Sequence, residues 1–522
     1  SLKSVSIGKS CTTISATAFN NATKLENINV SEDNEKYSSV DGALLNKEKT
    51  SIVLYPKSKS GEFVIPDTVT SIANRAFSSC PNLTKITIGA NVESVGAYAF
   101  SECIALTDVV FKDSTIDKKT IGNYAFYNCR ALSNVDFGNA VTSIGSCAFM
   151  IDKSLENVEF PDSLEEIDYC AFSCYENGTT GTYVASNLKS VKFGTGLKTI
   201  NNYAFYRNEK LETIEFLGNN LSLIGFRAFQ DCLSLTELNL TGNNTVIGDY
   251  AFNNNYALKE IVLSGVKTIG YSAFSRNYNL KSIDLGEDLI SIGSYAFQSC
   301  PNLETITLPE SLTLIDDYVF KDCSKLANIE IPNKITSLND NTFENCSSLK
   351  NISIGRGCTS ISSTAFAGAN SIEKITVDEN NKRYTSVDGA LYNKDKTTLV
   401  LSPKNRAGEF AVPDAVTSIA SYAFDNSPNL TKVIIGKNVT TIGTGAFRNC
   451  KSLETVVFED SYTVQKTIGD YAFNNCPTLT EVDFGNAVKS IGNYAFMTCK
   501  SIESLEFPDS LKSIGEGAFY EN

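Results

Sequence analysis

The sequence predicts one repeat solenoid in which short parallel β-strands stack along a single axis. The dipeptide Ala-Phe or a close variant recurs nineteen times, mostly at steps of 22 to 24 residues. Each repeat also contains a short segment in which apolar and polar residues alternate. An array of this kind buries its apolar residues between neighbouring repeats, so a division into separate globular domains is not expected over residues 1–522.

A parallel strand is the first element expected in each repeat. In Leu83-x-x-Ile86-x-Ile88 the apolar residues point to one face, which is the period of a strand with one buried side. Gly89 follows this segment, and other repeats have Pro there; both residues end strands. The matching prolines are Pro161, Pro309, Pro332 and Pro508.

A tight return arm is the second element. Its apolar residues follow at mixed spacings of three, four and one, which favours a helical or 3₁₀ turn or an irregular path. In the same repeat these are Val92, Val95, Ala99, Phe100 and Cys103.

A longer period lies over the short one. The Phe spacings 58, 23, 26, 23 and 23 that follow Phe19 return after Phe366, at an offset of 347 residues. Residues 1–175 therefore align without gaps on residues 348–522, which indicates a tandem duplication.

Each copy carries one insert, at about residues 31–56 and 378–403. Asp41-Gly42 and Asp388-Gly389 are turn residues between strand-like segments, so both inserts are expected to be β-hairpins. They either form a ligand-contacting knob or only add strands to a sheet. A third, polar insertion at Tyr175–Gly181 is expected to be a surface loop.

Composition excludes several function classes. The 522 residues carry 45 Lys and Arg against 59 Asp and Glu, a net charge of −14, which argues against a general nucleic-acid binder. There is no His, so His-based catalysis and His-ligated zinc are excluded. No apolar run is long enough for a membrane span, and no direct membrane insertion is expected.

The fifteen cysteines are expected to be structural. Ten of them stand three residues after the repeat Phe, where a thiol acts as a small buried apolar group. Disulfides between adjacent repeats are the alternative, and no clustered metal-ligand pattern is present. Tyr two residues before the repeat Phe is expected to form a column of rings that pack on one another rather than a sugar-binding surface.

The full repeat, Leu-x-x-Ile-x-Ile-Pro-x-x-Val-x-x-Ile-Gly-x-x-Ala-Phe-x-x-Cys, resembles the leucine-rich repeat of the BspA-like surface proteins. The resemblance implies a right-handed curved solenoid of about nineteen repeats, with the parallel sheet on the concave side and the arms on the convex side. It also implies a bacterial protein, secreted or on the cell surface, and adhesin-type members bind matrix or plasma proteins.

Acidic residues dominate the outward positions of the expected concave strands, with eleven acids against four bases. A negative potential there favours a basic or extended partner, although a solvated face is the simpler interpretation. The ligand-binding candidates are Asp136, Glu159, Glu215, Glu237, Glu260, Asp284 and Glu330.

The functional hypothesis is therefore a monomeric, non-catalytic binding module without a cofactor, which engages an extracellular protein or glycoprotein. A structural stalk that projects another domain is the alternative. Glu237 and Glu260 share one column and could serve a retaining glycosidase, but an exposed ladder has no water-excluding pocket. The same pair could hold Ca²⁺, and Asp33–Glu35 and Asp378–Asn380 resemble calcium loops only loosely.

Overall fold

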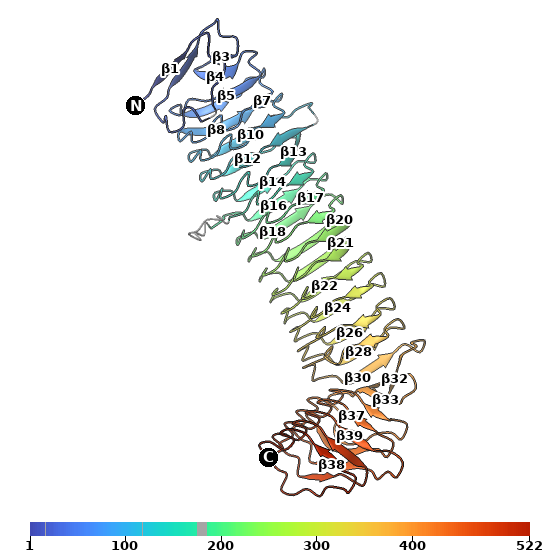
Figure 1. The fold of residues 1–522 in the computed structure, drawn as a ribbon. Coiled ribbons are helices and arrows are strands. Elements are labelled where there is room, and N and C mark those ends of the chain that lie inside the picture. Colours follow the sequence, from blue (N-terminus) through green and yellow to red (C-terminus); the bar gives the residue numbers. More distant parts are fainter. Residues whose placement is uncertain (16, 117, 175–184) are drawn as a thin grey trace. The chain divides into compact units, whose positions relative to one another are not determined.

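The computed structural model describes residues 1–15, 17–116, 118–174 and 185–522, so the insertion at 175–181 lies outside the described residues. The chain divides into two units, Ser1–Leu280 and Lys281–Asn522, and each is described by itself. Both are stacks of turns with two series of parallel strands, which we call the long-strand and the short-strand series (Figure 1). A single array over the whole chain stays a prediction.

The strands of the first unit fall into four groups. The long-strand series is β1 (Ser4–Ile7), β2 (Asn27–Val30), β6 (Gly61–Val64), β8 (Leu83–Ile88), β10 (Asp108–Phe111), β12 (Asn134–Asp136), β14 (Asn157–Glu159), β16 (Ser190–Phe193) and β18 (Thr213–Phe216). The short-strand series is β7 (Ser71–Ile72), β9 (Ser94–Val95), β11 (Lys119–Ile121), β13 (Val141–Ile144), β15 (Glu166–Ile167), β17 (Thr199–Ile200) and β19 (Leu223–Ile224). The insert forms β3 (Tyr37–Val40), β4 (Ala43–Asn46) and β5 (Ser51–Leu54), whereas β20 (Glu237–Ile247) and β21 (Glu260–Ile269) run through both series.

The second unit repeats this plan. Its long-strand series is β22 (Ser282–Asp284), β24 (Thr305–Thr307), β26 (Asn328–Ile331), β28 (Asn351–Ile354), β30 (Lys374–Val377), β34 (Gly408–Ala411), β36 (Leu430–Ile435), β38 (Thr455–Phe458) and β40 (Glu481–Asp483). Its short-strand series is β23 (Ser291–Ile292), β25 (Leu314–Ile315), β27 (Ser337–Leu338), β29 (Ser360–Ile361), β35 (Ser418–Ile419), β37 (Thr441–Ile442), β39 (Lys466–Ile468), β41 (Val488–Ile491) and β42 (Ser513–Ile514). The insert forms β31 (Tyr384–Val387), β32 (Ala390–Asn393) and β33 (Thr398–Leu401).

The long strands follow the alternation of the sequence. In β8, Leu83, Ile86 and Ile88 are fully buried. The backbone of β8 pairs in parallel with β6 and β10, and Ile86 lies opposite Val109. The predicted parallel strand with one buried face is therefore confirmed, and neighbouring repeats satisfy each other's backbone polar groups.

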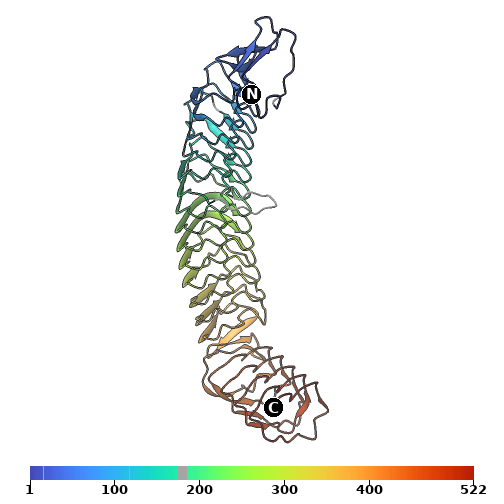
Figure 2. The same ribbon diagram turned by 90° about the vertical axis from the view of Figure 1, so that its left-hand side faces the viewer.

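The short strands were not predicted from the sequence. Ser94–Val95, in the arm, pairs in parallel with Ser71–Ile72 and with Thr120–Ile121. Because none of the described residues forms a helix, the helical or 3₁₀ alternative for the arms is wrong and the irregular one holds. The turns of the first unit lie as parallel layers in Figure 2.

Left-handed residues shape the rest of the arm. Tyr98 and Glu102 have φ of 57° and 60°, so no run of right-handed residues is long enough to propagate a helix. The N–H of Ala99 bonds to Gly96 within the repeat, whereas the N–H of Phe100 bonds to Ala125 of the next repeat at 2.7 Å. The arm therefore divides its hydrogen bonds between local turns and the neighbouring repeat.

The glycine of the Ile-Gly motif allows this close stacking. A Cβ on Gly96 would lie 2.6 Å from the backbone nitrogen of Asn74 in the preceding repeat. A side chain at Gly96 would therefore require the backbone of one of the two repeats to shift.

Stacked phenylalanines form the core between the two strand series. In the first unit, Phe100 and Phe126 are fully buried with ring centroids 5.0 Å apart. The ladder continues through Phe149, Phe172 and Phe205 at centroid distances of 5.0, 5.0 and 5.2 Å. One repeat alone cannot bury these rings, so the apolar core exists only in the stack.

The cysteines after each repeat Phe are buried, as predicted, and they also serve as donors. Cys103 and Cys129 are fully buried free thiols. The Cys103 thiol donates to the Phe77 carbonyl at 3.1 Å, and the Cys129 thiol to the Phe100 carbonyl at 3.1 Å. In repeats with Asn in this position, the Asn277 amide donates to the Phe252 carbonyl at 3.2 Å. The position therefore selects small side chains that can satisfy a buried carbonyl.

The tyrosines before each repeat Phe stack on one another, which confirms the prediction. Tyr98 and Tyr124 have ring centroids 4.7 Å apart, and Tyr295 and Tyr318 also 4.7 Å. Their rings are thus committed to each other rather than presented as an open sugar-binding face.

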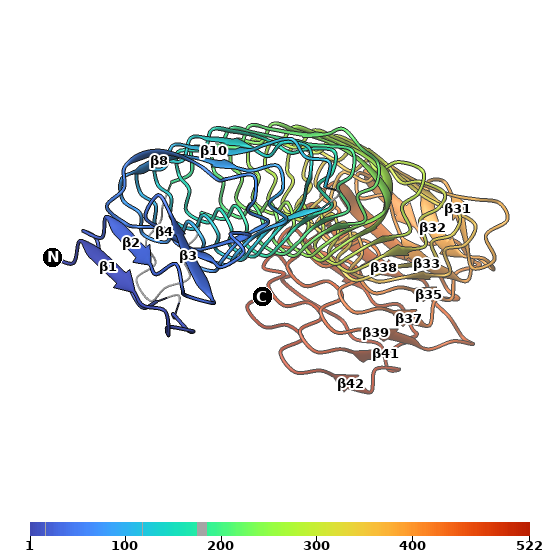
Figure 3. The same ribbon diagram turned by 90° about the horizontal axis from the view of Figure 1, so that it is seen from above.

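Both inserts are antiparallel hairpins, as predicted, and they extend the short-strand sheet. Asp41 and Gly42, with φ of 49° and 76°, form the turn between β3 and β4. β4 then pairs with β5, and β5 pairs in parallel with the short strand β7. The second insert repeats this order, because β32 pairs with β33 and β33 with β35 (Figure 3).

Candidate binding surface

The seven predicted carboxylates all lie on long strands, and all are exposed. In the first unit they belong to β12, β14, β18, β20 and β21, and in the second unit to β22 and β26. Buried neighbours such as Ile214 and Leu238 point to the core, so the acids point to solvent. These acids are Asp136, Glu159, Glu215, Glu237, Glu260, Asp284 and Glu330.

Glu237 and Glu260 are direct neighbours across two paired strands, as the sequence analysis expected. Both side chains are exposed. Two like charges opposite each other disfavour the pairing of β20 and β21, and a cationic group between them would relieve this repulsion.

Lysines neutralise other parts of the same sheet. Glu159 lies opposite Lys192, which lies opposite Glu215, and the Lys192 ammonium is 3.5 Å from the Glu215 carboxylate. Lys85 similarly lies 3.7 Å from Glu62. The predicted excess of acidic residues is therefore partly neutralised in the first unit, whereas Glu237 and Glu260 lie opposite each other rather than opposite a lysine.

Two of the predicted aspartates turn back onto their own strand ends. The carboxylates of Asp136 and Asp284 accept the N–H of Gly138 at 3.0 Å and of Gly286 at 2.9 Å. This contact ends each strand and limits how far the carboxylate can reach.

In the second unit, Glu330 lines a hollow of about 300 Å³ together with Glu310 and Asp378. Glu310 accepts hydrogen bonds from Asn333, and Asp378 accepts the N–H of Asn380 at 2.7 Å. Among the residues that the structure describes, no group of three acidic or Cys side chains is arranged to hold a metal ion.

One asparagine within the first segment that resembles a calcium loop, and one directly after the second, have a structural role. The amide of Asn34 donates to the Gly8 and Cys11 carbonyls, and its oxygen accepts the N–H groups of Lys36 and Tyr37. In the second copy Asn381 makes the matching four bonds. This asparagine joins each insert to the preceding repeat and has no oxygen left for an ion.

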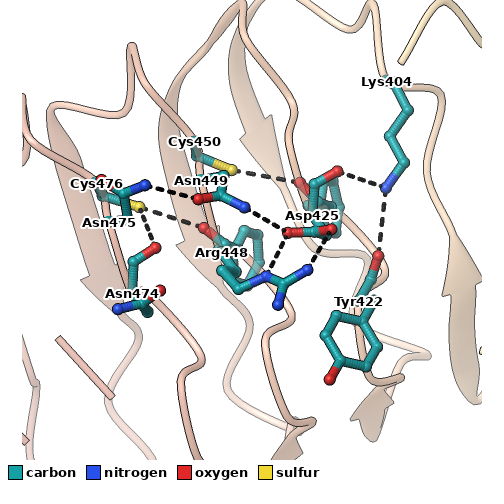
Figure 4. Close-up of polar contacts among 11 residues, drawn as sticks. Lys404, Tyr422, Asp425, Arg448, Asn449, Cys450, Asn474, Asn475 and Cys476 are labelled. Atoms are coloured by element: carbon teal, nitrogen blue, oxygen red, sulfur yellow. Dashed lines mark hydrogen bonds and ion pairs between the residues drawn. The ribbon is translucent and has the colours of Figure 1, made fainter. Parts of the chain in front are cut away.

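A cavity beside the second insert was missed by the sequence analysis. It has a volume of about 330 Å³ and is lined by Lys404, Asp425 and Arg448, among others (Figure 4). The available signal was a lysine that follows proline at the end of both inserts, Lys57 and Lys404. Only the fold shows that the Lys404 ammonium reaches the carbonyls of Tyr422 and Asp425 in the next repeat.

Comparison with known proteins identifies the family. The model of the BspA type leucine rich repeat region matches in 6 copies, at residues 1–60, 51–178, 179–289, 267–394 and 417–522. The chain belongs to this family. The resemblance drawn from the repeat motif is thus confirmed, and the chain matches no curated protein in sequence.

Three solved structures with likeness to this BspA-type chain are bacterial proteins. A leucine-rich repeat protein from Eubacterium ventriosum is 28% identical, covers 55% of this chain and 88% of its own, and has a TM-score of 0.41. A leucine rich cell surface protein from Faecalibacterium prausnitzii is 19% identical over 94% of this chain and 99% of its own, with a TM-score of 0.31. The pneumococcal vaccine antigen PcpA is 21% identical over 70% of this chain and 76% of its own, with a TM-score of 0.34.

No helix in the described part of this BspA-type chain is long and apolar enough to cross a bilayer.

Proposed function

We propose that this BspA-type chain is a non-catalytic binding module of a bacterial surface or secreted protein. It engages an extracellular protein or glycoprotein through the outward face of its long strands. The family supports the module, and the exposed carboxylates of Glu237 and Glu260, opposite each other, are the observation that carries the choice of face.

The chemistry of this face favours a cationic partner. A Lys or Arg side chain placed between Glu237 and Glu260 would relieve their repulsion and gain charge-assisted hydrogen bonds. Because both carboxylates are exposed, the interaction is expected to weaken as salt rises. The remaining candidates, Asp136, Glu159, Glu215, Asp284 and Glu330, add weaker attraction.

Binding to an array of matrix proteins, plasma proteins and glycans tests the proposal. A saturable, salt-sensitive partner should lose affinity about tenfold or more when Glu237→Lys and Glu260→Lys are combined. The matched control is Glu93→Lys with Glu209→Lys, which changes the net charge equally at exposed positions outside the long strands. Equal losses in both variants would reduce the effect to net charge alone.

A stalk remains the alternative function. It predicts a blank array with folded protein and no effect of either charge-reversal pair. An enzyme with Glu237 and Glu260 as its carboxylates stays a weaker prediction, because both groups are exposed on the sheet.

A further inference from the structure

The cavity of the second unit lies where the insert rejoins the repeat array. One wall is the turn from Ile361 to Gly368, another is the end of the insert with Val400, Leu401 and Lys404, and a third is formed by Ala420, Ser421 and Tyr422. The repeat phenylalanines on either side, Phe366 and Phe424, are 58 residues apart in the chain. The insert therefore separates two turns that are adjacent elsewhere, and a space of about 330 Å³ remains.

The anionic group at the cavity is already neutralised. The Asp425 carboxylate accepts two hydrogen bonds from Arg448, at 2.9 and 3.1 Å, and a longer one from Asn449 at 3.4 Å (Figure 4). The Arg448 guanidinium also lies over the Tyr422 ring at 5.0 Å. Asp425 and Arg448 thus satisfy each other and leave no net charge for a guest.

Besides the Asp425–Arg448 pair, the cavity is lined by one more charged group, the Lys404 ammonium. Its side chain is 4% exposed, and its ammonium donates to the carbonyls of Tyr422 at 3.3 Å and of Asp425 at 2.8 Å. Both acceptors are neutral, and an ammonium has three N–H groups. Lys404 also lines the cavity, and its burial lowers the pKa of its ammonium to about 8, although the Asp425 charge acts in the opposite direction.

The rest of the lining is mixed, with apolar residues on one part and Ser362, Ser363, Thr364, Ser421 and Tyr422 on another. Ile361, Val400, Leu401 and Ala420 are only partly covered by protein, so a guest with a hydrocarbon body would remove apolar surface from water. A single cation that is not already paired with a carboxylate favours a singly charged guest carboxylate over a phosphate, whose second charge would lack a cationic partner.

We propose that this cavity binds a small organic monocarboxylate, whose carboxylate pairs with the Lys404 ammonium and whose hydrocarbon body lies against Ile361, Val400 and Leu401. The inference concerns a different surface from the acidic long strands, so it stands or falls independently of the proposed function.

The first copy supplies an internal control. Lys57 stands at the matching position and is also buried, at 5% exposed. Ser78 and Ser101, whose hydroxyls lie 3.0 Å apart, replace Asp425 and Arg448 there. A variant of Lys57 therefore tests the loss of a buried lysine without touching the cavity.

The experiment compares two ligands on the unchanged full chain by titration calorimetry at pH 7. 4-Phenylbutanoate is the carboxylate probe, and 4-phenylbutanamide has the same body without the charge. The carboxylate is expected to bind about tenfold or more tightly, the ratio given by about 1.4 kcal/mol. Equal affinities, or no binding of the carboxylate, would overturn the proposal. Binding of inorganic phosphate in preference to the carboxylate would also overturn it.

Variants then place the site. Lys404→Met should lose carboxylate binding, Ala367→Leu at the rim should weaken both probes, and Lys57→Met should leave both affinities unchanged. Equal losses in the two lysine variants would contradict the assignment to this cavity. Circular dichroism confirms that each variant is folded.

Proton uptake on binding distinguishes a lysine that pairs with the ligand from a lysine that has only a structural role. Since the carboxylate favours the charged ammonium, binding at pH 8.5 should take up protons, seen as a dependence of the heat on buffer ionisation. Affinity should fall as the pH rises from about 8 to 10, because free Lys404 loses its proton there. A pH-independent affinity would contradict the ion pair.

Discussion

The two duplicated copies, residues 1–175 and 348–522, keep the same scaffold but fill it differently. Asn34 and Asn381 make the same four hydrogen bonds, and each insert adds the same three strands. By contrast, the pair Ser78 and Ser101 becomes Asp425 and Arg448. Side chains that satisfy backbone groups are thus the same in both copies, whereas the side chains in the space between neighbouring repeats differ.

An aromatic ring comes from different segments of the insert in the two copies. In the first copy Tyr55, directly after β5, stacks on Phe77 at 4.7 Å, and β4 carries Leu45. In the second copy the matching residues are Ser402 and Tyr392, and Tyr392 belongs to the core cluster with Phe424. One bulky ring is kept in both copies, although it comes from different segments.

The largest effect on stability is expected when the ring of Tyr55 is removed. Tyr55→Ser should lower the free energy of unfolding by about 4 kcal/mol, because it leaves a large cavity against Phe77 and Phe63. Adding Leu45→Tyr recreates the second copy's arrangement and should restore about half of the loss. Urea unfolding measures both changes, and the absence of rescue would show that the two rings do not fill equivalent space.

The next largest effects on stability are expected from the buried lysines that occupy matching positions in the two copies. The Lys466 ammonium donates to the carbonyls of Gly436, Lys437 and Val439, and Lys119 donates to Gly89 and Lys112. Lys466→Met should cost about 3 kcal/mol and Lys119→Met about 2 kcal/mol, because buried carbonyls lose their donors.

Hydrogen exchange of the amides around β39 and β11 locates each of these losses. Exchange that rises equally across the whole chain, rather than around the substituted strand, would contradict a local role. The surface variant Lys210→Met serves as the control for loss of one positive charge.

The pair that distinguishes the copies should show strong coupling. Asp425→Ser leaves the guanidinium of Arg448 partly buried without its carboxylate and should cost about 2 kcal/mol. The double variant Asp425→Ser with Arg448→Ser copies the first copy's hydroxyl pair and should cost less than the single one. Additive losses in the double-mutant cycle would mean that the pair contributes no interaction energy.

The smallest effect is a pH dependence specific to the second copy. Burial lowers the pKa of Lys404 to about 8, well below the usual value of a lysine, so the unfolded chain binds the proton more tightly. Stability should therefore rise with pH between about 8 and 10.5, and this rise should be absent in Lys404→Met. The chain has no His, which removes imidazole titration from the baseline. A difference between the two proteins that is constant with pH would rule this linkage out.

Much of the fold could be predicted because its signals are local and repeated. The alternation in Leu83–Ile88 marks a strand, and Asp41-Gly42 marks a hairpin turn in any context. The short strand Ser94–Val95 could not be predicted, because two residues carry no period and their pairing depends on the neighbouring repeat.

The features of the candidate surfaces were likewise predictable only in part. The exposure of Glu237 and Glu260 and their place in one column followed from the repeat length, because equal repeats bring equal positions into register. The neutralisation of Glu215 by Lys192 required knowing that β16 lies between β14 and β18 across the long insertion.

The sequence by itself determined the repeat, the family, the duplication and the buried face of each strand, since all of these depend on residues close together in the chain. Only the tertiary structure decided that Lys404 lies beside a cavity with Asp425 and Arg448, and that the thiols of the arms bond to carbonyls of the preceding repeat. These contacts join residues that are about one repeat or more apart in the chain. Their geometry depends on how far an insert separates two neighbouring repeats.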